Sequence, residues 1–412
     1  MTDVDLSMRT PSFDDINQKR KVGDRYRPDF RTPKVRERQL FGEVSMDTTV
    51  TDAGSEQCSL LRLSSANGPV YRKVKIAPLR DARPDEIPLI DLSGIYSTSL
   101  GDRKAVAAQI HNAATNNGFF YVKNHEISES VIKAAYDSSL EFFRQPEEIK
   151  QKVNAELSPC LNGWKPPKTQ RINESESIDV RETFSFRYNP MYDPAVSGNL
   201  EAIPAEIRES LVTNEFCWEK TTNLPNLKTN VINYWRATLS LARHLTRSFA
   251  LALSLPETHF DSKITYPDAG IGLNYYPSIP PSSPNSQEQV SIGSHTDFQL
   301  FTILWQDANG GLQVLNREGE WINAVPIEGT FVVNIGDYLQ RITNDKYIST
   351  VHRARNLSGK ERISMPMFFG FNLNETCGAL DSCVDEEHPR KYEPISCKEW
   401  VELRVKAMHT TK

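Results

Sequence analysis

Residues 290–305 read VSIGSHTDFQLFTILW, and this stretch decides the fold class. Two apolar runs, 290–294 and 300–305, flank the polar tripeptide His295-Thr296-Asp297. Each run is short and rich in β-branched and aromatic residues, a composition typical of strands. The stretch therefore predicts two strands joined through a polar tripeptide.

Further runs of the same kind lie on both sides of this stretch. They span 271–276, 312–315, 321–325, 330–334 and 362–371, and clusters of Gly, Pro, Asn and Asp separate them. Many short strands at regular spacing predict a sandwich or barrel of antiparallel strands. Because the strands are gathered in one block, a doubly wound α/β sheet is excluded.

Helices are predicted mainly before this block. The longest signal covers 230–255, where apolar residues recur at steps of three or four until Pro256, a pattern typical of a helix that faces the core. Earlier, 103–115 and 128–152 have helical spacing, the second broken at Pro146. Strands are predicted at 87–92 and 119–122.

The first part of the chain has a different composition. Residues 19–38 hold nine basic and three acidic residues, and residues 44–70 are rich in Ser, Thr, Gly and Asp. Such segments bury too little apolar surface to offset the entropy of ordering. We therefore predict a flexible extension over 1–84 that contains, at most, short pieces docked on the rest of the protein. Its basic run is interpreted as a solvated tail, with an electrostatic contact or a nuclear signal as the alternatives.

Composition narrows the class of protein. The 412 residues are 38% hydrophobic and 25% charged, with a net charge of −5, which does not fit a basic nucleic-acid binder. Six cysteines without a C-x-x-C pair make neither a disulfide scaffold nor a zinc ribbon. Neither a signal peptide nor a run of about 20 apolar residues is evident. We expect a cytoplasmic protein without membrane or nucleic-acid partners.

The polar tripeptide holds the candidate metal ligands. In an extended chain residues i and i+2 point to the same side, so His295 and Asp297 are able to present an imidazole and a carboxylate to one point. His352, 57 residues after His295, supplies a third candidate. Two histidines and one carboxylate on one face of a metal leave three positions open, the arrangement that suits Fe(II) and oxygen chemistry. By itself His-x-Asp is a weak signal, and the alternative is a surface tripeptide without function.

A second candidate group begins ten residues after His352. Arg362 enters the apolar run 362–371, and a buried arginine needs a partner because an unpaired buried charge is costly. Its guanidinium matches a carboxylate bidentately, and Ser364 adds a hydroxyl on the same side. The alternative is a structural salt bridge to a carboxylate of the protein.

These motifs, taken in order, resemble those of the iron- and 2-oxoglutarate-dependent dioxygenases of the isopenicillin N synthase-like family. The matching segments are IPLID (87–91), NGFFYVKN (117–124), DVRETFSF (179–186), NYYP (274–277), HTD (295–297), NIGDYLQRITN (334–344), STVHR (349–353) and RIS (362–364). They span most of 85–371. The extension is not covered, and the part after about 375 is covered weakly.

The resemblance implies a fold and a set of roles. The fold is mainly β with flanking helices, a distorted double-stranded β-helix (jelly roll) with an α/β N-terminal part. The implied roles are iron ligation by His295, Asp297 and His352, and binding of 2-oxoglutarate by Arg362, Ser364, Tyr276 and Asn274. The implied cofactors are Fe(II), 2-oxoglutarate as co-substrate, and O₂.

The resemblance also implies how the chain is divided into regions. Residues 85–230 are predicted to form the N-terminal α/β region, 231–375 the central helix and jelly-roll core with the iron site, and 376–412 a C-terminal helical tail. Phe298, Leu304, Phe368 and Trp164 are candidates for substrate contact. Core packing is the alternative for the first three, and capping of the barrel is the alternative for Trp164.

The predicted function is hydroxylation, desaturation or cyclisation of a small molecule in specialised metabolism, with release of succinate and CO₂. One alternative is an isopenicillin N synthase-type oxidase that needs no 2-oxoglutarate. Another is a non-catalytic jelly-roll binding protein. The motifs do not specify the substrate or the oligomeric state.

Overall fold

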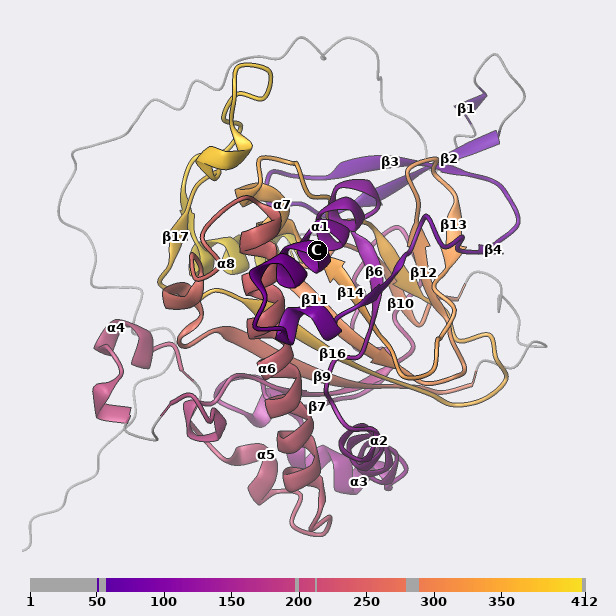
Figure 1. Cartoon of the computed structure of the whole chain (residues 1–412). Coiled ribbons are helices and arrows are strands. Elements are labelled where there is room, and N and C mark those ends of the chain that lie inside the picture. Colours follow the sequence, from indigo (N-terminus) through magenta and orange to yellow (C-terminus); the bar gives the residue numbers. More distant parts are fainter. Residues whose placement is uncertain (1–49, 52–56, 197–199, 212, 279–288, 410–412) are drawn as a thin grey trace, which may run out of the picture. The chain divides into compact units, whose positions relative to one another are not determined.

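The computed structural model describes residues 50–51, 57–196, 200–211, 213–278 and 289–409 (Figure 1). Thr49–Lys412 form one compact unit, so the regions predicted at 85–230, 231–375 and 376–412 are parts of it. The basic run at 19–38 lies outside the described residues. No helix among the described residues is both long and apolar enough to cross a membrane.

Two sheets form the centre of the fold. The larger has eight strands in the order β5 (Leu89–Asp91), β6 (Phe119–Lys123), β14 (Phe331–Ile335), β11 (Phe301–Gln306), β16 (Arg362–Gly370), β9 (Asp268–Tyr276), β8 (Glu182–Phe186) and β7 (Gly163–Lys165). The smaller has five, in the order β10 (Ile292–His295), β15 (His352–Ala354), β12 (Leu312–Leu315), β13 (Trp321–Asn323) and β4 (Arg80–Asp81). The predicted class, mainly β with flanking helices around a double-stranded β-helix, is confirmed.

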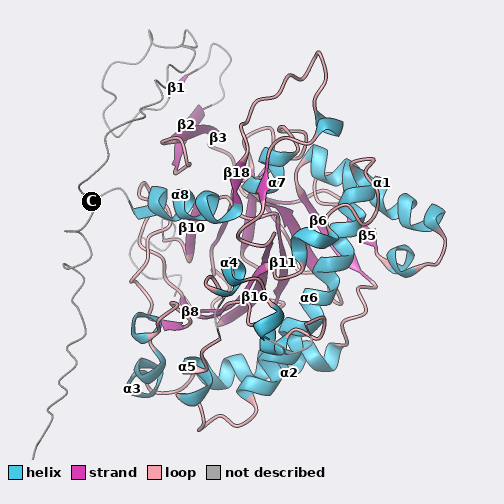
Figure 2. Ribbon diagram, turned by 90° about the vertical axis from the view of Figure 1, so that its left-hand side faces the viewer, coloured by secondary structure: helices cyan, strands magenta, loops and turns pink. Residues whose placement is uncertain are grey.

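Helices flank the sheets. They are α1 (Leu100–Asn116), α2 (Glu129–Phe143), α3 (Glu147–Lys150), α4 (Ala205–Arg208), α5 (Phe216–Glu219), α6 (Leu227–Ala252), α7 (Asp337–Ile342) and α8 (Cys397–His409). Of these, α1, α2 and α6 pack against the larger sheet. Pro146 separates α2 from α3, as predicted. In Figure 2, α1 and α6 lie on one side of the strands and α8 on the side of β10.

Helix α6 attaches the helical layer to the sheet. Its apolar face, including Trp235, Leu239 and Leu245, is buried, which confirms the predicted core stripe. Two polar atoms on that face also have partners: the Tyr234 hydroxyl donates to the Met365 carbonyl of β16 at 2.9 Å, and the Trp235 indole donates to the Ala269 carbonyl of β9 at 3.3 Å. These bonds fix α6 across the two strands that carry the candidate co-substrate residues.

The prediction of a flexible segment up to residue 84 is wrong for residues 57–84. Strands β2 (Gln57–Leu63) and β3 (Val70–Lys75) form a hairpin that β1 (Val50–Thr51) extends, and β4 pairs with β13. Leu63 and Val74 are buried against Leu315 and Val351 of the core. A polar composition therefore does not exclude an ordered hairpin, because distant parts of the chain bury Leu63 and Val74. A two-stranded sheet of β17 (Thr376–Cys377) and β18 (Ile395–Ser396) precedes α8.

Candidate metal centre and adjoining cavity

Strand pairing brings the two candidate histidines together. β10 and β15 are antiparallel neighbours, and His295 lies directly opposite His352 in their register. The centroids of the two imidazole rings are 4.3 Å apart. The 56 residues between them include β11, β12, β13, β14 and α7, and after this excursion the first residue of β15 lies opposite the last residue of β10.

Hydrogen bonds orient both imidazoles in the same way. His295 Nδ1 lies 2.8 Å from the Gly293 carbonyl oxygen, and His352 Nδ1 lies 3.1 Å from the Thr350 carbonyl oxygen. A carbonyl only accepts, so each Nδ1 carries the hydrogen. Each Nε2 is then a lone-pair donor, the form in which histidine binds a metal.

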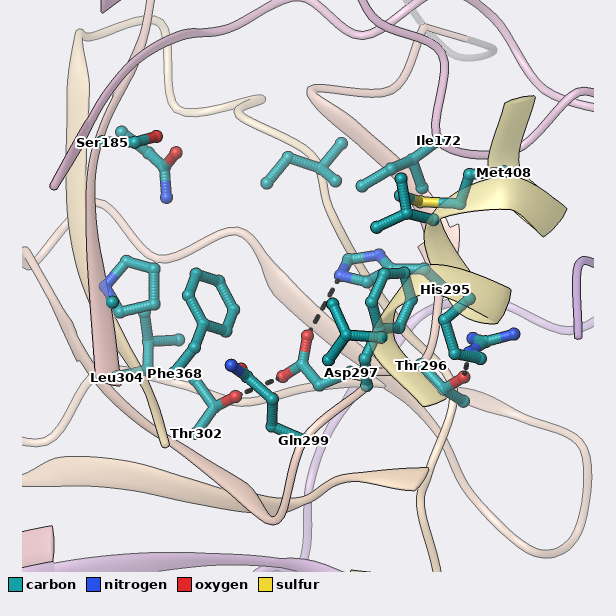
Figure 3. A pocket seen from close by; sticks show the side chains of 18 of the residues that line it. Ile172, Ser185, His295, Thr296, Asp297, Gln299, Thr302, Leu304, Phe368 and Met408 are labelled. Carbon is teal, nitrogen blue, oxygen red and sulfur yellow. Dashed lines mark hydrogen bonds and ion pairs between the residues drawn. The ribbon is translucent and has the colours of Figure 1, made fainter. Parts of the chain in front are cut away.

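Asp297 reaches the same point, held by the other sheet. Its carboxylate accepts hydrogen bonds from Thr302 Oγ1 on β11 at 2.6 Å and from Asn334 Nδ2 on β14 at 2.8 Å. Figure 3 shows its carboxylate between His295 and Thr302. The distances from Nε2 of His295 and His352 to its two oxygens are 3.7 and 3.8 Å. The triad therefore bridges the two sheets.

The surroundings set the charge of these groups. Burial and the neighbouring imidazole of His352 lower the pKa of His295 to about 3, so His295 is neutral at pH 7. Burial acts to raise the pKa of Asp297, but His352, His295, Asn334 and Thr302 together lower it below its ordinary value. A neutral imidazole beside an ionised carboxylate is the protonation state that metal binding requires.

The three side chains make a donor set for one ion. One ligand atom from each of His295, Asp297 and His352 lies within 4.8 Å of the others, and within the described ranges no other group of His, Cys, Asp and Glu converges in this way. Two nitrogens and a carboxylate oxygen suit a divalent transition metal such as Fe(II). The sequence prediction that these three residues converge is confirmed by the geometry.

Arg362 is buried without a protein carboxylate. Its side chain is 2% exposed, and Nη2 donates to Gln306 Oε1 at 3.1 Å. Within the described residues, Nε and Nη1 are buried without a partner, and no ion pair forms. Asp307 attracts Arg362 from nearby, but its oxygens accept the backbone N–H groups of Ile363 and Asn309. The alternative of a structural salt bridge is therefore wrong, and two nitrogens of the guanidinium have no partner among the described residues.

The neighbours of Arg362 complete a polar pocket. The guanidinium lies over the Tyr276 ring, 4.5 Å from its centroid, and the Tyr276 hydroxyl is 3.0 Å from Ser364 Oγ. Arg362 pairs with Tyr276 and Ser364 with Asn274 across β16 and β9. Asn274 Oδ1 accepts from Arg181 Nη1 at 2.8 Å, a cation that sequence reasoning missed. The four predicted co-substrate residues therefore lie together.

One cavity of about 610 Å³ joins the triad to this pocket. Phe298, Leu304 and Phe368 line it, which places all three where the sequence analysis expected substrate contact. Figure 3 shows Leu304 and Phe368 on one wall and Met408 of α8 near His295. A volume of this size is typical of a small-molecule site.

The structure contradicts the prediction for Trp164. Its side chain is 1% exposed in the main hydrophobic core, and its indole donates to Glu182 Oε2 at 2.7 Å. Lys150 binds the same carboxylate at 2.5 Å. Pairing of β7 with β8 directs the ring toward this buried ion pair, so it does not line the cavity.

Helix α8 covers one side of the metal centre through a contact that the sequence did not reveal. Arg404 is 2% exposed and pairs with Asp337 at 2.9 Å, while its Nη2 lies 3.2 Å from Thr296 Oγ1. The Trp400 indole donates to the Phe298 carbonyl at 2.8 Å. Both contacts fall on the segment around Asp297. An arginine in an otherwise ordinary amphipathic helix gives no sequence signal for such a role.

Replacing Arg404 with methionine is expected to lower the free energy of unfolding by about 3–5 kcal/mol, because the largely buried Asp337 carboxylate, 18% exposed, loses its cationic partner. Burial raises the pKa of Asp337 and Arg404 opposes this, so the carboxylate depends on the cation. Urea unfolding of Arg404→Met and of the double variant Arg404→Met/Asp337→Asn measures the effect. The double variant should recover much of the loss; equal stability of Arg404→Met and the unchanged protein would contradict the assignment.

Two family descriptions match the chain. Residues 87–210 match "non-haem dioxygenase in morphine synthesis N-terminal", and residues 267–371 match "2OG-Fe(II) oxygenase superfamily". The second segment contains the triad, Arg362 and Ser364.

Relatives and solved structures agree with these matches. A 2-oxoglutarate-Fe(II) type oxidoreductase ppzC of Metarhizium majus is 54% identical over 88% of this chain and 97% of its own length. A 2-oxoglutarate-Fe(II) type oxidoreductase hxnY of Emericella nidulans is 29% identical over 77% of this chain and 89% of its own. A full-length Neurospora crassa protein, whose crystal structure was determined in complex with alpha-KG, matches with a TM-score of 0.66 and 27% identity, covering 79% of this chain and 99% of that one.

Proposed function

The chain belongs to the 2OG-Fe(II) oxygenase superfamily and is an Fe(II)- and 2-oxoglutarate-dependent dioxygenase, and from this premise we propose which of its residues perform each part of the reaction. His295, Asp297 and His352 hold the iron. Arg362 and Ser364 hold the distal carboxylate of 2-oxoglutarate, with Tyr276 and Asn274 beside them. The observation that carries the proposal is the convergence of three ligand atoms within 4.8 Å at one cavity with an unpaired buried arginine.

The donor set fits Fe(II). Two imidazoles and one carboxylate bind a divalent ion of intermediate softness, and Asp297 alone supplies negative charge. Thr302 and Asn334 fix the carboxylate, and the carbonyls of Gly293 and Thr350 fix the imidazoles. Because these partners are already in place, the ligands need little rearrangement to bind the ion.

Arg362 fits the co-substrate. Its Nε and Nη1 are buried without partners, and a buried guanidinium gains a counter-ion and hydrogen-bond acceptors when a carboxylate binds. Ser364 Oγ and the Tyr276 hydroxyl lie within reach of the same anion. The Tyr276 ring also makes a cation–π contact with the guanidinium.

Iron together with 2-oxoglutarate and O₂ supplies the oxidation of a substrate C–H bond, with release of succinate and CO₂. The protein holds the substrate beside the metal in the cavity. Phe298, Leu304 and Phe368 present apolar surface there, and we propose that they orient the substrate and exclude water. Hydroxylation, desaturation or cyclisation, and a place in specialised metabolism, stay predictions of the sequence analysis.

Removal of the metal tests this function directly. We expect the protein reconstituted with Fe(II) to form succinate from 2-oxoglutarate in the presence of O₂, to lose this activity with a chelator, and to regain it when Fe(II) returns. Metabolite extracts that accelerate succinate release identify candidate substrates. Oxygen uptake that is equally fast without 2-oxoglutarate would point to the isopenicillin N synthase-type alternative, and protein that binds no iron would point to the non-catalytic one.

A further inference from the structure

One face of β9 runs the length of the cavity. Residues alternate across a strand, so Asp268, Asn274 and Tyr276 point to the same side, with glycines at 270 and 272 between them. All of them except Gly272 line the cavity. Asn274 and Tyr276 belong to the co-substrate pocket beside Arg362. Asp268 lies at the other end of the same face.

The strand register places Asp268 beyond the metal centre. Thr302, which binds the Asp297 carboxylate, pairs with Phe368, and Phe368 pairs with Gly270. The triad is therefore level with Gly270. Asp268 is two residues further along, roughly 7 Å, in the direction that leads away from Arg362. A molecule bound on the far side of the metal from 2-oxoglutarate meets Asp268.

Gln299 holds the Asp268 carboxylate in place. Its Nε2 donates to Asp268 Oδ2 at 2.5 Å, and its side chain packs over Gly370, where a Cβ would lie 3.3 Å from Gln299 Cγ. Asp268 Oδ1 and Gln299 Oε1 have no hydrogen-bond partner in the described part of the chain. Both residues line the cavity and both are half-buried. Both side chains therefore offer an acceptor oxygen at the wall of the cavity (Figure 3 shows Gln299 among the cavity side chains).

The charge at this end of the cavity is not balanced by an ion pair. Burial raises the pKa of Asp268, while the hydrogen bond from Gln299 and the charge of Arg187 act to lower it. Arg187 also lines the cavity, but it is exposed to solvent and makes no ion pair with Asp268 among the described residues. A carboxylate taken partly out of water is stabilised by a cation that also donates hydrogen bonds. 2-Oxoglutarate cannot be this cation, because it is itself an anion.

We propose that Asp268 and Gln299 form the substrate-recognition end of this site, and that the substrate presents to them a positively charged group rich in N–H donors, an ammonium or an amidinium. The proposal rests on the proposed function, since it describes the substrate of that same cavity. The charged group binds at Asp268, and the C–H bond to be oxidised lies between it and the triad. The pair thus selects for charge, and the apolar wall selects for shape.

A pair of matched probes tests this directly. n-Butylguanidinium and n-butylurea have nearly the same size, but only the first is charged. Their dissociation constants are measured by calorimetry on the full-length protein, with and without Fe(II) and 2-oxoglutarate under anaerobic conditions. We expect butylguanidinium to bind at least about tenfold more tightly than butylurea, which equals about 1.4 kcal/mol. In Asp268→Asn this preference should disappear.

Two further variants show whether a loss of preference in Asp268→Asn comes from a lost contact with the probe, from the lower negative charge of the cavity, or from misfolding. Glu402→Gln removes one negative charge from the same cavity, on α8, and should keep the preference. If Asp268→Asn does not fold, Asp268→Glu keeps the charge but moves it by one methylene, and should weaken butylguanidinium alone. Equal binding of the two probes, a preference that survives in the Asp268 variants, or an equal loss in Glu402→Gln would overturn the proposal. Failure to bind Fe(II) would instead refute the proposed function, because the probe comparison also runs without metal.

Discussion

Replacing His352 with alanine is expected to remove measurable succinate formation, a loss of at least about a thousandfold, equivalent to about 4 kcal/mol of transition-state stabilisation. His352 supplies one of two imidazole ligand atoms, and no other histidine in the described structure lies close enough to replace it. His295→Ala and Asp297→Ala should have the same effect. Iron content after anaerobic reconstitution and succinate release measure the two consequences separately.

A matched histidine provides the control. His388 is exposed and its ring contacts Asp385 at the surface, so His388→Ala should keep full iron content and full activity. Thr302→Val removes one hydrogen bond to Asp297. Its effect should lie between those of His352→Ala and His388→Ala, with roughly a 10–100-fold loss in metal affinity or activity. Full turnover in His352→Ala would refute the ligand assignment.

Replacing Arg362 with methionine should raise the KM for 2-oxoglutarate without removing the iron. Truncating one partner of a buried, hydrogen-bonded charge pair costs about 2–5 kcal/mol, which corresponds to roughly thirtyfold to several thousandfold. Arg362→Lys should recover little, because an ammonium does not offer two parallel N–H groups to a carboxylate. Steady-state kinetics against 2-oxoglutarate, with iron content measured in parallel, give the result.

The stability of the protein without co-substrate gives a second test of the role of Arg362. In the absence of co-substrate Arg362 is a buried cation whose Nε and Nη1 have no partner among the described residues, so its removal should not lower stability as the loss of a paired residue does. Arg362→Met is therefore expected to unfold at the same or a higher urea concentration than the unchanged protein. A KM unaffected by Arg362→Met would contradict the assignment of the co-substrate site.

Much of the fold and the site could be predicted because local patterns carried them. The short β runs at 271–371 became β9 to β16, although β15 and α7 were not predicted. His295 and Asp297 share a short extended segment, so their joint orientation follows from chain geometry. Arg362 was identifiable because a charge at the start of an apolar strand demands a partner. In these cases the residues that identify the site are close to one another in the sequence, so a local pattern is enough to predict it.

The features that could not be predicted depend on contacts between distant segments. Trp164 is buried where its indole donates to Glu182, which also pairs with Lys150, and no local sequence pattern indicates these contacts. The hairpin of β2 and β3 is ordered by Leu315 and Val351, far along the chain. Asp268 owes its place in the cavity to the register of β9 with β16, which composition does not encode.

An anaerobic titration tests the central claim most directly: the metal-free protein is mixed with Fe(II), then with 2-oxoglutarate, and visible absorption is recorded. The account predicts one Fe(II) per chain and a charge-transfer band that grows with 2-oxoglutarate to one equivalent, absent in His352→Ala and shifted to much higher concentration in Arg362→Met. A band of unchanged strength in His352→Ala, or no iron bound by the unchanged protein, would contradict it.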